Sequence, residues 1–242
     1  NINVNCGSKN PEMVQKLVLE TNADVGLSFD GDADRLIAVD ECGNIIDGDH
    51  ILAICGASLK EKGKLNNNTV VGTVMTNMGL DVYLKGKNIN VVKTKVGDRY
   101  VIEEMLSNDY VLGGEQSGHI IFLEHNTTGD GLLTAIQLIS VIVETGKKAS
   151  ELNNTMTNFP QVLVNAKVKN ESKNTYMEDE IIRKEIQKIE EIFHGEGRVV
   201  IRPSGTEPLV RVMIEGKEED KITEIATNLA NLIEERLGNK EN

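Results

Sequence analysis

Three aspartates stand at alternate positions in the segment DGDADR, namely Asp30, Asp32 and Asp34. Their carboxylates repel one another when they are close, so this spacing predicts a tight loop that turns the oxygens towards a cation. Mg²⁺ takes about six oxygen ligands, and three aspartates leave room for water or a phosphate oxygen. We therefore predict a magnesium site at these residues, with Arg35 either as their counter-ion or as a contact for a phosphate.

Two other interpretations of this segment compete with a magnesium site. The three aspartates and Glu41 occupy the first, third, fifth and twelfth positions of an EF-hand loop, but Arg35 stands where that loop needs glycine. The flanking segments GLSF and LIAVD have the character of strands, whereas helices flank an EF-hand loop. A solvated acidic turn remains open from these residues alone.

A second polar segment, LGGEQSGHIIF, places Glu115, Ser117 and His119 among glycines and between two apolar runs. The glycines permit a tight turn that presents side chains to a cleft. A carboxylate and a hydroxyl can bind adjacent sugar hydroxyls, and an imidazole can transfer a proton near neutral pH. We predict a sugar-binding turn, and a surface hairpin with incidental polar residues is the alternative.

A third polar segment, IRPSGTEPLVR, holds Arg202, Ser204, Gly205 and Thr206 between two apolar runs, with a proline on either side of the Ser-Gly-Thr turn. Hydroxyls and successive backbone N–H groups can hold phosphate oxygens, and a guanidinium offers a planar fork to a phosphate. The segment is not a P-loop, because no G-x-x-x-x-G-K-[ST] motif occurs. Ordinary turn chemistry explains the proline, serine and glycine equally well, but it explains Arg202 less readily.

Alternating helical and strand-like segments predict the scaffold that positions these loops. Apolar spacing predicts helices over 10–22, 50–63, 80–86, 99–107, 129–146, 180–193 and 222–233. Strands are predicted over 23–29, 69–75, 89–94, up to Gly113, and over 161–169, 197–202 and 208–216. This order predicts an α/β fold of layered domains with mixed sheets, followed by a small α+β domain with an antiparallel sheet.

Two segments of this scaffold carry a more specific expectation. The helix over 129–146 is apolar almost all round, so we expect it to lie buried. Residues 151–160 are polar, rich in asparagine and threonine, and end at a proline, which predicts a linker.

The composition argues against two classes of partner. The 242 residues carry a formal net charge of −12, which is unlike a protein that binds nucleic-acid backbones. No apolar run approaches the roughly 18 residues of a membrane span, so no membrane partner is expected. The three cysteines lack metal-site spacing and are interpreted as thiols of a reducing compartment, which predicts a cytoplasmic protein.

Together the three polar segments, in this order and at these separations, resemble the metal loop, the sugar-binding loop and the phosphate-binding loop of the α-D-phosphohexomutase superfamily. GEQSGH, VGDRYV from Val96 and TTGDG from Thr127 are most similar to the bacterial phosphoglucosamine mutase branch. The resemblance runs through essentially the whole chain.

The resemblance also implies a domain organisation, because members of this superfamily have four domains. Residues 1–46 would be the C-terminal half of the second domain, 47–152 the third domain and 153–242 the fourth. The family's phosphoserine lies in a Thr-Ala-Ser-His-Asn-Pro-like loop of the first domain, which this sequence lacks. Ser8 has Lys9 where the family has histidine, so we do not assign Ser8 as the nucleophile, and we expect a fragment that is inactive alone.

For the reaction, the resemblance implies a mutase of amino-sugar and cell-wall precursor metabolism. It would interconvert glucosamine 6-phosphate and glucosamine 1-phosphate through the phosphoserine and a bisphosphorylated sugar. The three aspartates would hold Mg²⁺ beside the phosphoserine, with Arg35 close to the transferring group. Glu115 and Ser117 would bind sugar hydroxyls, and His119 would transfer a proton or contact the sugar.

The same resemblance assigns the loop near the C-terminus to the phosphate that does not react. Arg202, Ser204, Gly205 and Thr206 would hold this phosphate, and Arg211 would assist them. Elsewhere in the chain, the basic residues Lys93, Lys95 and Arg99 either add positive charge to the cleft or merely balance an acidic protein.

Several alternatives stay open at this point. A phosphomannomutase or phosphoglucomutase of the same superfamily, or a non-catalytic phosphosugar-binding module, would use the same loops. A phosphatase with an aspartate nucleophile fits less well, because the usual D-x-D-x-T/V motif is missing. A truncated second domain would leave an apolar face uncovered, which predicts association, and a homodimer is among the oligomeric states left open.

Overall fold

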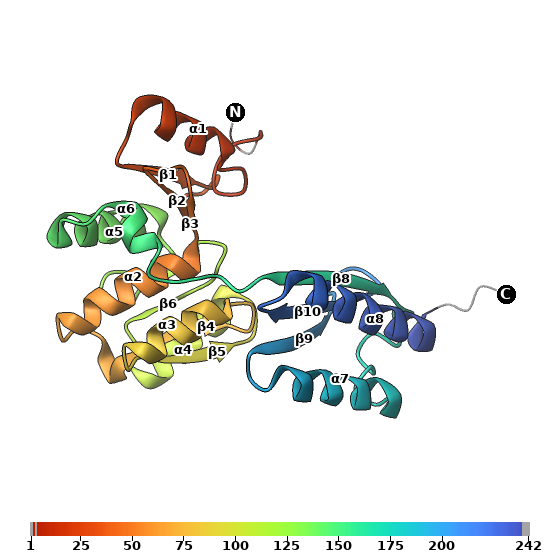
Figure 1. Cartoon of the computed structure of the whole chain (residues 1–242). Coiled ribbons are helices and arrows are strands. Elements are labelled where there is room, and N and C mark those ends of the chain that lie inside the picture. The colour runs from red at the N-terminus through yellow and green to blue at the C-terminus, as the bar shows by residue number, and fades with distance from the viewer. Residues whose placement is uncertain (1, 3, 239–242) are drawn as a thin grey trace. The chain divides into compact units, whose positions relative to one another are not determined.

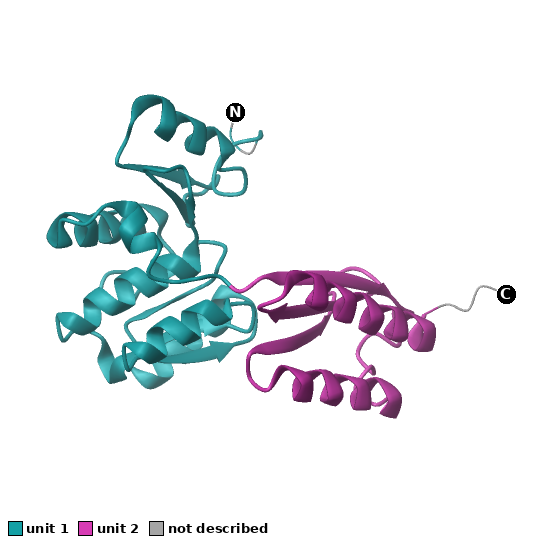
Figure 2. Ribbon diagram, in the orientation of Figure 1, with its two compact units in different colours: residues 1–158 teal, residues 159–242 magenta. Residues whose placement is uncertain are grey.

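The computed structural model describes residues 2 and 4–238, which form two compact units. Unit 1 runs from Asn1 to Asn158 and unit 2 from Phe159 to Asn242 (Figure 2). Both combine helices with strands, and the larger unit contains a mixed sheet, so the predicted α/β class is confirmed (Figure 1).

A small antiparallel sheet with one helix opens unit 1. Its strands, in the spatial order β1-β2-β3, are β1 (Val25–Phe29), β2 (Leu36–Asp40) and β3 (Ile45–Ile46). Helix α1 (Glu12–Thr21) lies on this sheet, where a Cβ at Gly26 would come within 2.6 Å of both Val14 and Val18. The glycine therefore lets the helix approach the strand closely.

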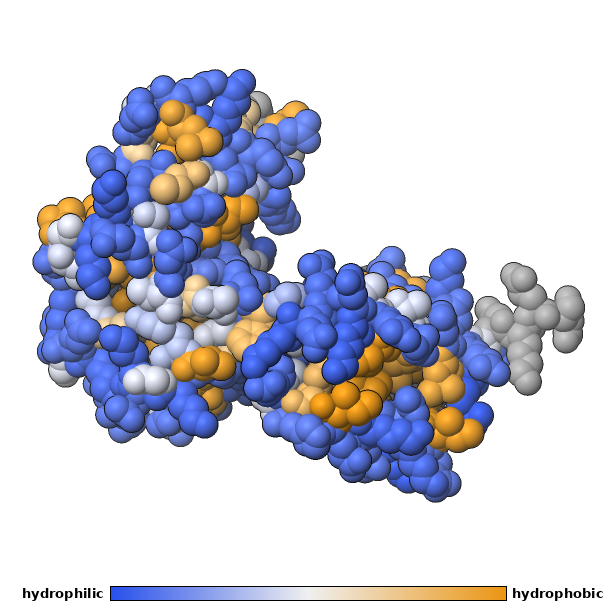
Figure 3. Space-filling model, viewed as in Figure 1, coloured by the Kyte–Doolittle hydropathy of each residue, from blue (hydrophilic) through white to orange (hydrophobic). Residues whose placement is uncertain are grey.

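The outer side of α1 is apolar and exposed. Met13, Leu17 and Leu19 are each more than half exposed, and apolar residues interrupt the hydrophilic surface there (Figure 3). Two of these three residues, Met13 and Leu17, belong to the helical pattern that the sequence displays, while Val18 is the buried residue of the helix. The association that we expect from an uncovered apolar face stays a prediction.

The larger part of unit 1 is a four-stranded mixed sheet in the order β5-β4-β6-β7. Strands β4, β5 and β6 are parallel, and β7 runs antiparallel to β6. The strands are β4 (Thr69–Thr73), β5 (Asn90–Thr94), β6 (Leu112–Gly114) and β7 (Ile120–Phe122). The helical segments are α2 (Gly48–Glu61), the 3₁₀ turn η1 (Asn66–Asn68), α3 (Met78–Gly86), α4 (Asp98–Asn108), α5 (Gly131–Thr145) and α6 (Ala149–Asn153).

Helices cover both faces of this mixed sheet. Neighbouring residues of β4 point to opposite faces, as the period of a strand requires. Val70 belongs to the main core with α2 and α3, whereas Val71 packs with Val101 and Met105 of α4. A parallel sheet with two covered faces consists of nearly continuous apolar runs, and all five residues of β4 are buried.

Helix α5 is not buried all round, so that expectation was wrong. Ala135, Leu138 and Val141 are buried in the core, but Ile136 and Val143 are 57% and 72% exposed. The helix packs on α2, β2 and β7 from one side only. An apolar sequence does not supply a second layer to cover the other side, which is why composition alone overestimated its burial.

The predicted linker 151–160 begins as folded structure. Its first three residues belong to α6, and both Leu152 and Met156 are buried in the main core. Only the end of this segment connects the two units. Its polar composition was misleading because Asn153 is buried and donates a hydrogen bond to Asp40 Oδ2 over 3.0 Å.

Unit 2 is a three-stranded antiparallel sheet with two helices. The strands, in the order β8-β10-β9, are β8 (Gln161–Lys167), β9 (Gly197–Pro203) and β10 (Leu209–Gly216). Helices α7 (Glu180–Phe193) and α8 (Glu219–Leu237) pack on the sheet and on each other (Figure 1). The predicted apolar face of α7 is confirmed, because its members are all buried: Ile182, Ile186, Ile189 and Phe193.

The thiols and the helix lengths give two simple findings. Cys6, Cys42 and Cys55 are all free thiols. Within the described part of the chain, no helix combines the length and the apolar character that crossing a bilayer requires.

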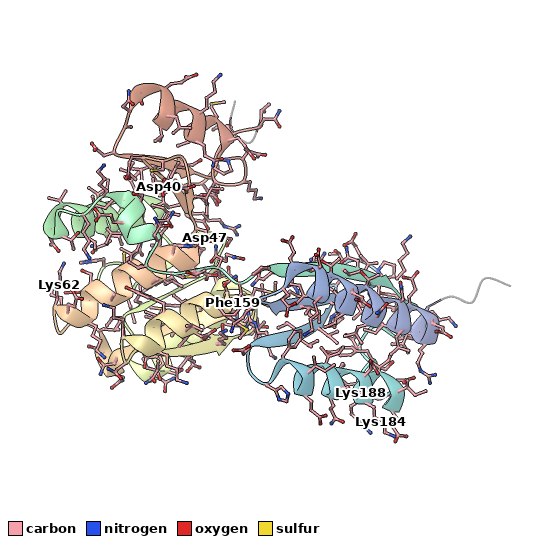
Figure 4. All side chains as sticks on the ribbon, viewed as in Figure 1. Asp40, Asp47, Lys62, Phe159, Lys184 and Lys188 are labelled. Carbon is pink, nitrogen blue, oxygen red and sulfur yellow. The ribbon has the colours of Figure 1, made fainter. Side chains whose placement is uncertain are left out.

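Buried acidic groups fasten the small sheet of unit 1 to its larger part. Asp40, at the end of β2 (Figure 4), is fully buried and accepts hydrogen bonds from the backbone of Cys42 and Asn44 and from Asn153. Next to it, the Glu41 carboxylate accepts from the backbone N–H and the hydroxyl of Ser150. Glu41 thus satisfies a free N–H group in the first turn of α6 from a distant segment.

Replacing Glu41 with glutamine should weaken unit 1 at neutral pH but not in acid. Burial alone would raise the pKa of Glu41, but hydrogen bonds from Ser150 outweigh it and lower the pKa below its usual 4.5. The stabilisation is therefore complete above about pH 4.5 and is lost as pH falls through the lowered pKa. Thermal unfolding across this range should show the two proteins converging in acid.

The exposed Glu61 at the end of α2 provides the matched control, since Glu61→Gln should leave that pH profile unchanged. A difference between wild type and Glu41→Gln that persists undiminished in acid would contradict this role for Glu41.

A glycine in the turn between β6 and β7 forms the second joint of unit 1. Gly118 accepts a hydrogen bond from Leu36 N over 3.1 Å, has a φ of +93°, and a Cβ there would lie 2.1 Å from Leu36 O. Gly118→Ala should therefore destabilise unit 1 by roughly 2 kcal/mol or more, through strain and a steric clash. Urea unfolding measures the loss.

Gly63 offers the comparison for Gly118, because its φ is +67° but a Cβ there would meet nothing within 4 Å. Gly63→Ala should show only the smaller cost of the left-handed conformation. Equal losses in the two variants would mean that the contact with Leu36 is unimportant.

Candidate functional site

The three aspartates converge in the loop between β1 and β2. One carboxylate oxygen from each of Asp30, Asp32 and Asp34 lies within 4.8 Å of the others. Asp30 and Asp34 are half-buried and Asp32 is exposed. Ala33 takes a left-handed φ of 60°, and Arg35 N donates to Asp30 Oδ1 over 3.1 Å, so the backbone makes the tight loop that the sequence predicted.

The charge balance of this loop favours a cation. Burial raises the pKa of Asp34, and the neighbouring Asp30 and Asp32 raise it further. Arg35 Nε lies 3.7 Å from an oxygen of Asp30 and 3.7 Å from Asp34 Oδ1, which is an ion-pair distance but not a hydrogen bond. Asp34 Oδ1 is buried and accepts no hydrogen bond. Three hard oxygen donors and one unsatisfied buried oxygen fit a hard divalent cation.

The GEQSGH segment forms the turn between β6 and β7, as its glycines predicted. Glu115 N donates to His119 O over 3.0 Å, and Gly118 N donates to Glu115 O over 2.9 Å. Ser117 is exposed at the tip and Glu115 is half-buried. One carboxylate oxygen of Glu115 accepts from Gly97 N over 3.0 Å, so the VGDR segment holds this side chain in place.

Helix α2 supports this turn from its N-terminus. Gly48 N donates to Gln116 O over 3.0 Å, and the Gln116 amide lies 3.4 Å from Asp47 Oδ2. Asp47 also caps α2 through His50 N, at the point labelled in Figure 4. Gly48 has to be glycine, because a Cβ would lie 2.0 Å from Glu115 O. Just past its other end, Lys62 ties α2 to α5 through an ion pair with Glu144.

The metal loop and the GEQSGH turn are joined directly. Leu36 N donates to Gly118 O, and Gly131 N at the start of α5 donates to Ala33 O over 2.9 Å. His119 Nδ1 lies 3.0 Å from Asp34 Oδ2. Two segments that are about eighty residues apart in the sequence therefore form one corner of unit 1.

His119 stands differently from the role expected of it. Its side chain is 4% exposed, Nδ1 faces Asp34, and Nε2 accepts a hydrogen bond from Gly129 N over 3.1 Å. Both ring nitrogens therefore have protein partners. This arrangement is unfavourable for a contact with sugar or for direct proton transfer to it.

Two of the three basic residues named in the sequence form ion pairs with acidic neighbours. Lys93 forms an ion pair with Asp81, and Arg99 forms one with Glu103. The Lys95 ammonium lies 5.8 Å from the ring centre of Tyr100. Of the two expectations for these residues, balancing the acidic groups of the protein describes Lys93 and Arg99 better.

Unit 2 presents a concentration of positive charge at its own loop. Arg202 of β9 lies directly opposite Arg211 of β10, and the Nε atoms of both are buried without a hydrogen-bond partner. Burial, and after it the charge of Arg211, lowers the pKa of Arg202. Like charges facing each other across two strands are unfavourable, so an anion that bridges them would relieve the repulsion.

The remaining loop residues of unit 2 divide into two groups. Gly205 and Thr206 are exposed, whereas Ser204 is buried and its hydroxyl accepts a hydrogen bond from Glu207 N over 3.2 Å. Glu207 also forms an ion pair with Arg211 over 3.2 Å. Ser204 thus shapes the turn, while the exposed residues are the ones that a ligand can reach.

Three residues of the two units were missed as site residues in the sequence. Gly97 and Gly129 each donate a backbone hydrogen bond to a predicted site residue, and Lys173 Nζ lies 3.5 Å from Gly205 O. The glycines could have been found, because both stand in the motifs VGDRYV and TTGDG. Lys173 gave no signal, since it lies in a polar stretch without a pattern.

Comparisons with known proteins match both units. Residues 47–159 match the family model described as phosphoglucomutase/phosphomannomutase, alpha/beta/alpha domain III, and residues 163–232 match the C-terminal domain of the same family. The phosphoglucosamine mutase of Thermoanaerobacter sp. (strain X514) is 64% identical over 236 residues, covering 98% of this chain and 53% of that protein. That of Alkaliphilus metalliredigens is 66% identical over 238 residues, with the same coverage.

Solved structures show the same fold at low identity. Aspergillus fumigatus N-acetylphosphoglucosamine mutase, in complex with GlcNAc-6P and magnesium, matches 96% of this chain and 57% of that protein, with a TM-score of 0.77 and 22% identity. An N-acetylglucosamine-phosphate mutase in its product complex, described as a member of the α-D-phosphohexomutase superfamily, matches with a TM-score of 0.72 and 21% identity, covering 96% of this chain and 53% of that protein.

The chain spans about half the length of the curated relatives that it matches. Two models of one family account for most of its residues, and its relatives and structural neighbours are phosphohexomutases by name. The chain therefore belongs to the phosphoglucomutase/phosphomannomutase family, within the α-D-phosphohexomutase superfamily.

Proposed function

We propose that this chain forms the metal-binding, sugar-binding and phosphate-binding part of a phosphoglucosamine mutase, which interconverts glucosamine 6-phosphate and glucosamine 1-phosphate. The observation that carries the proposal is the convergence of three carboxylates within 4.8 Å on a loop bonded directly to the GEQSGH turn. Relatives at 60–66% identity are named phosphoglucosamine mutases, which favours the amino sugar over a neutral hexose.

Asp30, Asp32 and Asp34 are the residues that would hold Mg²⁺. A bound Mg²⁺ offsets the carboxylate charge and stabilises negative charge on a transferring phosphoryl group. The Arg35 guanidinium, next to the carboxylates, adds a positive group that can reach a phosphate oxygen. Support for magnesium comes from the donor set itself and from a structural neighbour whose complex contains magnesium.

The sugar is assigned to the exposed tip of the GEQSGH turn. One carboxylate oxygen of Glu115 accepts from Gly97 N, and the other can accept hydrogen bonds from sugar hydroxyls. Ser117 is exposed near it and can donate to or accept from a hydroxyl. Because adjacent hydroxyls look alike from this turn, the same pair can hold the sugar in either of two orientations, as two successive transfers require.

The phosphate that does not react is assigned to the loop of unit 2. Arg202 and Arg211 provide two guanidinium groups, and Gly205 and Thr206 provide an exposed backbone that can approach the anion. Ser204 contributes through the shape of the loop. Binding of a phosphate converts the unfavourable arginine pair into a favourable site, which is a reason for the pair to exist.

The phosphoryl carrier is assigned to a segment outside this sequence. The family's Thr-Ala-Ser-His-Asn-Pro-like loop does not occur among the 242 residues, and Ser8 is buried beside Phe29, to which its N–H donates. In the family's domain scheme, we assign residues 1–46 to the second domain, 47–152 to the third and 153–242 to the fourth. The 242 residues alone should therefore bind ligands but not turn them over.

Turnover assays test this function directly. With Mg²⁺ and a bisphosphate activator, the 242-residue chain should not convert glucosamine 6-phosphate, whereas a protein that carries it behind the phosphoserine loop should. Glucose 6-phosphate and mannose 6-phosphate serve as competing substrates. Turnover by the chain alone would contradict the assignment of the carrier, and a preference for a neutral hexose would contradict the assignment of the substrate.

Removing one arginine of the facing pair should weaken phosphosugar binding. Arg202→Ala deletes a charge-assisted contact, so the affinity for glucosamine 6-phosphate should fall roughly ten- to a hundredfold by calorimetry. The exposed Arg183 on α7 supplies the control, since Arg183→Ala makes the same change in net charge. If both variants bind equally well, the loop of unit 2 is not the phosphate site.

A further inference from the structure

We propose that His119 is a positioning residue, which fixes the Asp34 carboxylate for metal binding, and that Gly129 sets the place of its ring. The inference rests on the proposed metal site. It gives His119 a structural link to the metal in place of a direct contact with the sugar. It also gives the TTGDG segment a role that its sequence does not reveal.

The hydrogen bonds of His119 define which ring nitrogen carries the proton. Gly129 N–H can only donate, and it lies 3.1 Å from Nε2, so Nε2 must be the acceptor. A neutral ring then carries its proton on Nδ1, which donates to Asp34 Oδ2 over 3.0 Å. A protonated ring would set an Nε2–H group against Gly129 N–H. The backbone therefore selects the ring form that donates to Asp34.

This donation restricts the carboxylate of Asp34. Oδ2 is held by His119, while Oδ1 stays buried without a hydrogen bond, 3.7 Å from Arg35 Nε. A carboxylate fixed through one oxygen presents the other at a defined place. Groups that orient metal ligands in this way commonly change metal affinity ten- to a hundredfold when they are removed.

Gly129 fits the ring of His119 so closely that no side chain can stand there. A Cβ at this position would lie 2.4–2.6 Å from three atoms of the imidazole ring. Two residues on, Gly131 N donates to Ala33 O, and a Cβ there would lie 2.6 Å from Arg35 O. Between them, Asp130 caps α5 by accepting from Leu133 N over 2.9 Å. The start of α5 thus holds both His119 and the backbone of the metal loop.

The surroundings of the ring agree with an orienting role. His119 is nearly inaccessible, with a 4% exposed side chain, and its charged neighbours are Asp34 and, 4.0 Å from Nε2, Asp98. A group that exchanges protons with the sugar needs a free nitrogen facing the ligand. Neither nitrogen of His119 is free, because each is matched to a protein group of the right polarity.

Two substitutions separate the two ends of the imidazole. The side-chain amide of asparagine can replace Nδ1 and donate to Asp34, whereas the longer amide of glutamine can replace Nε2 and accept from Gly129. Mn²⁺ binding to the 242-residue chain, followed by the electron paramagnetic resonance of free Mn²⁺, should show near wild-type affinity for His119→Asn. His119→Gln and Gly129→Ala should each lose roughly ten- to a hundredfold.

A double-mutant cycle removes effects of general stability. In an Asp34→Asn background, His119→Gln should cause no further loss of Mn²⁺ affinity, because the group that it orients has gone. A full loss in that background, or equal affinities for His119→Asn and His119→Gln, would overturn the positioning role while leaving the metal site intact. Absence of Mn²⁺ binding by the wild-type chain would overturn the metal site and this inference together.

Discussion

Repulsion among three carboxylates within 4.8 Å of one another is the constraint on which the organisation of unit 1 depends. The neighbouring elements oppose it: Arg35 lies beside two of the aspartates, and the loop backbone is held by β2, by the GEQSGH turn and by the start of α5. None of these contacts neutralises the loop completely. A fold that concentrates negative charge and then clamps it in place is arranged for a cation.

Unit 2 shows the same principle with the opposite sign. Arg202 and Arg211 face each other across a strand pair, and the buried Nε atoms of both lack a hydrogen bond. Each unit therefore keeps an unfavourable charge arrangement that its own residues do not resolve. The ligands proposed for the two units have the charges that these arrangements need, because a phosphate group matches the arginines and a divalent cation matches the aspartates.

The sequence predicted what local pattern determines. The buried stripe of α7 and the glycine-bounded turn between β6 and β7 follow from spacing and turn chemistry. Burial of α5 was predicted wrongly, because its exposed side depends on which layers surround it and not on its own residues. The contact between His119 and Asp34 joins residues 85 apart in the sequence, so nothing local indicates it. For the same reason, Gly129 could be noticed as part of a motif but not assigned a partner.

The central claim is that Asp30, Asp32 and Asp34 form a divalent metal site, and crystallography of the chain with Mn²⁺ tests it most directly. We expect an anomalous difference peak among the three carboxylates, at about 2.1–2.2 Å from their oxygens, with His119 still bonded to Asp34. Carboxylates turned apart into solvent, with no metal between them at saturating Mn²⁺, would contradict the account.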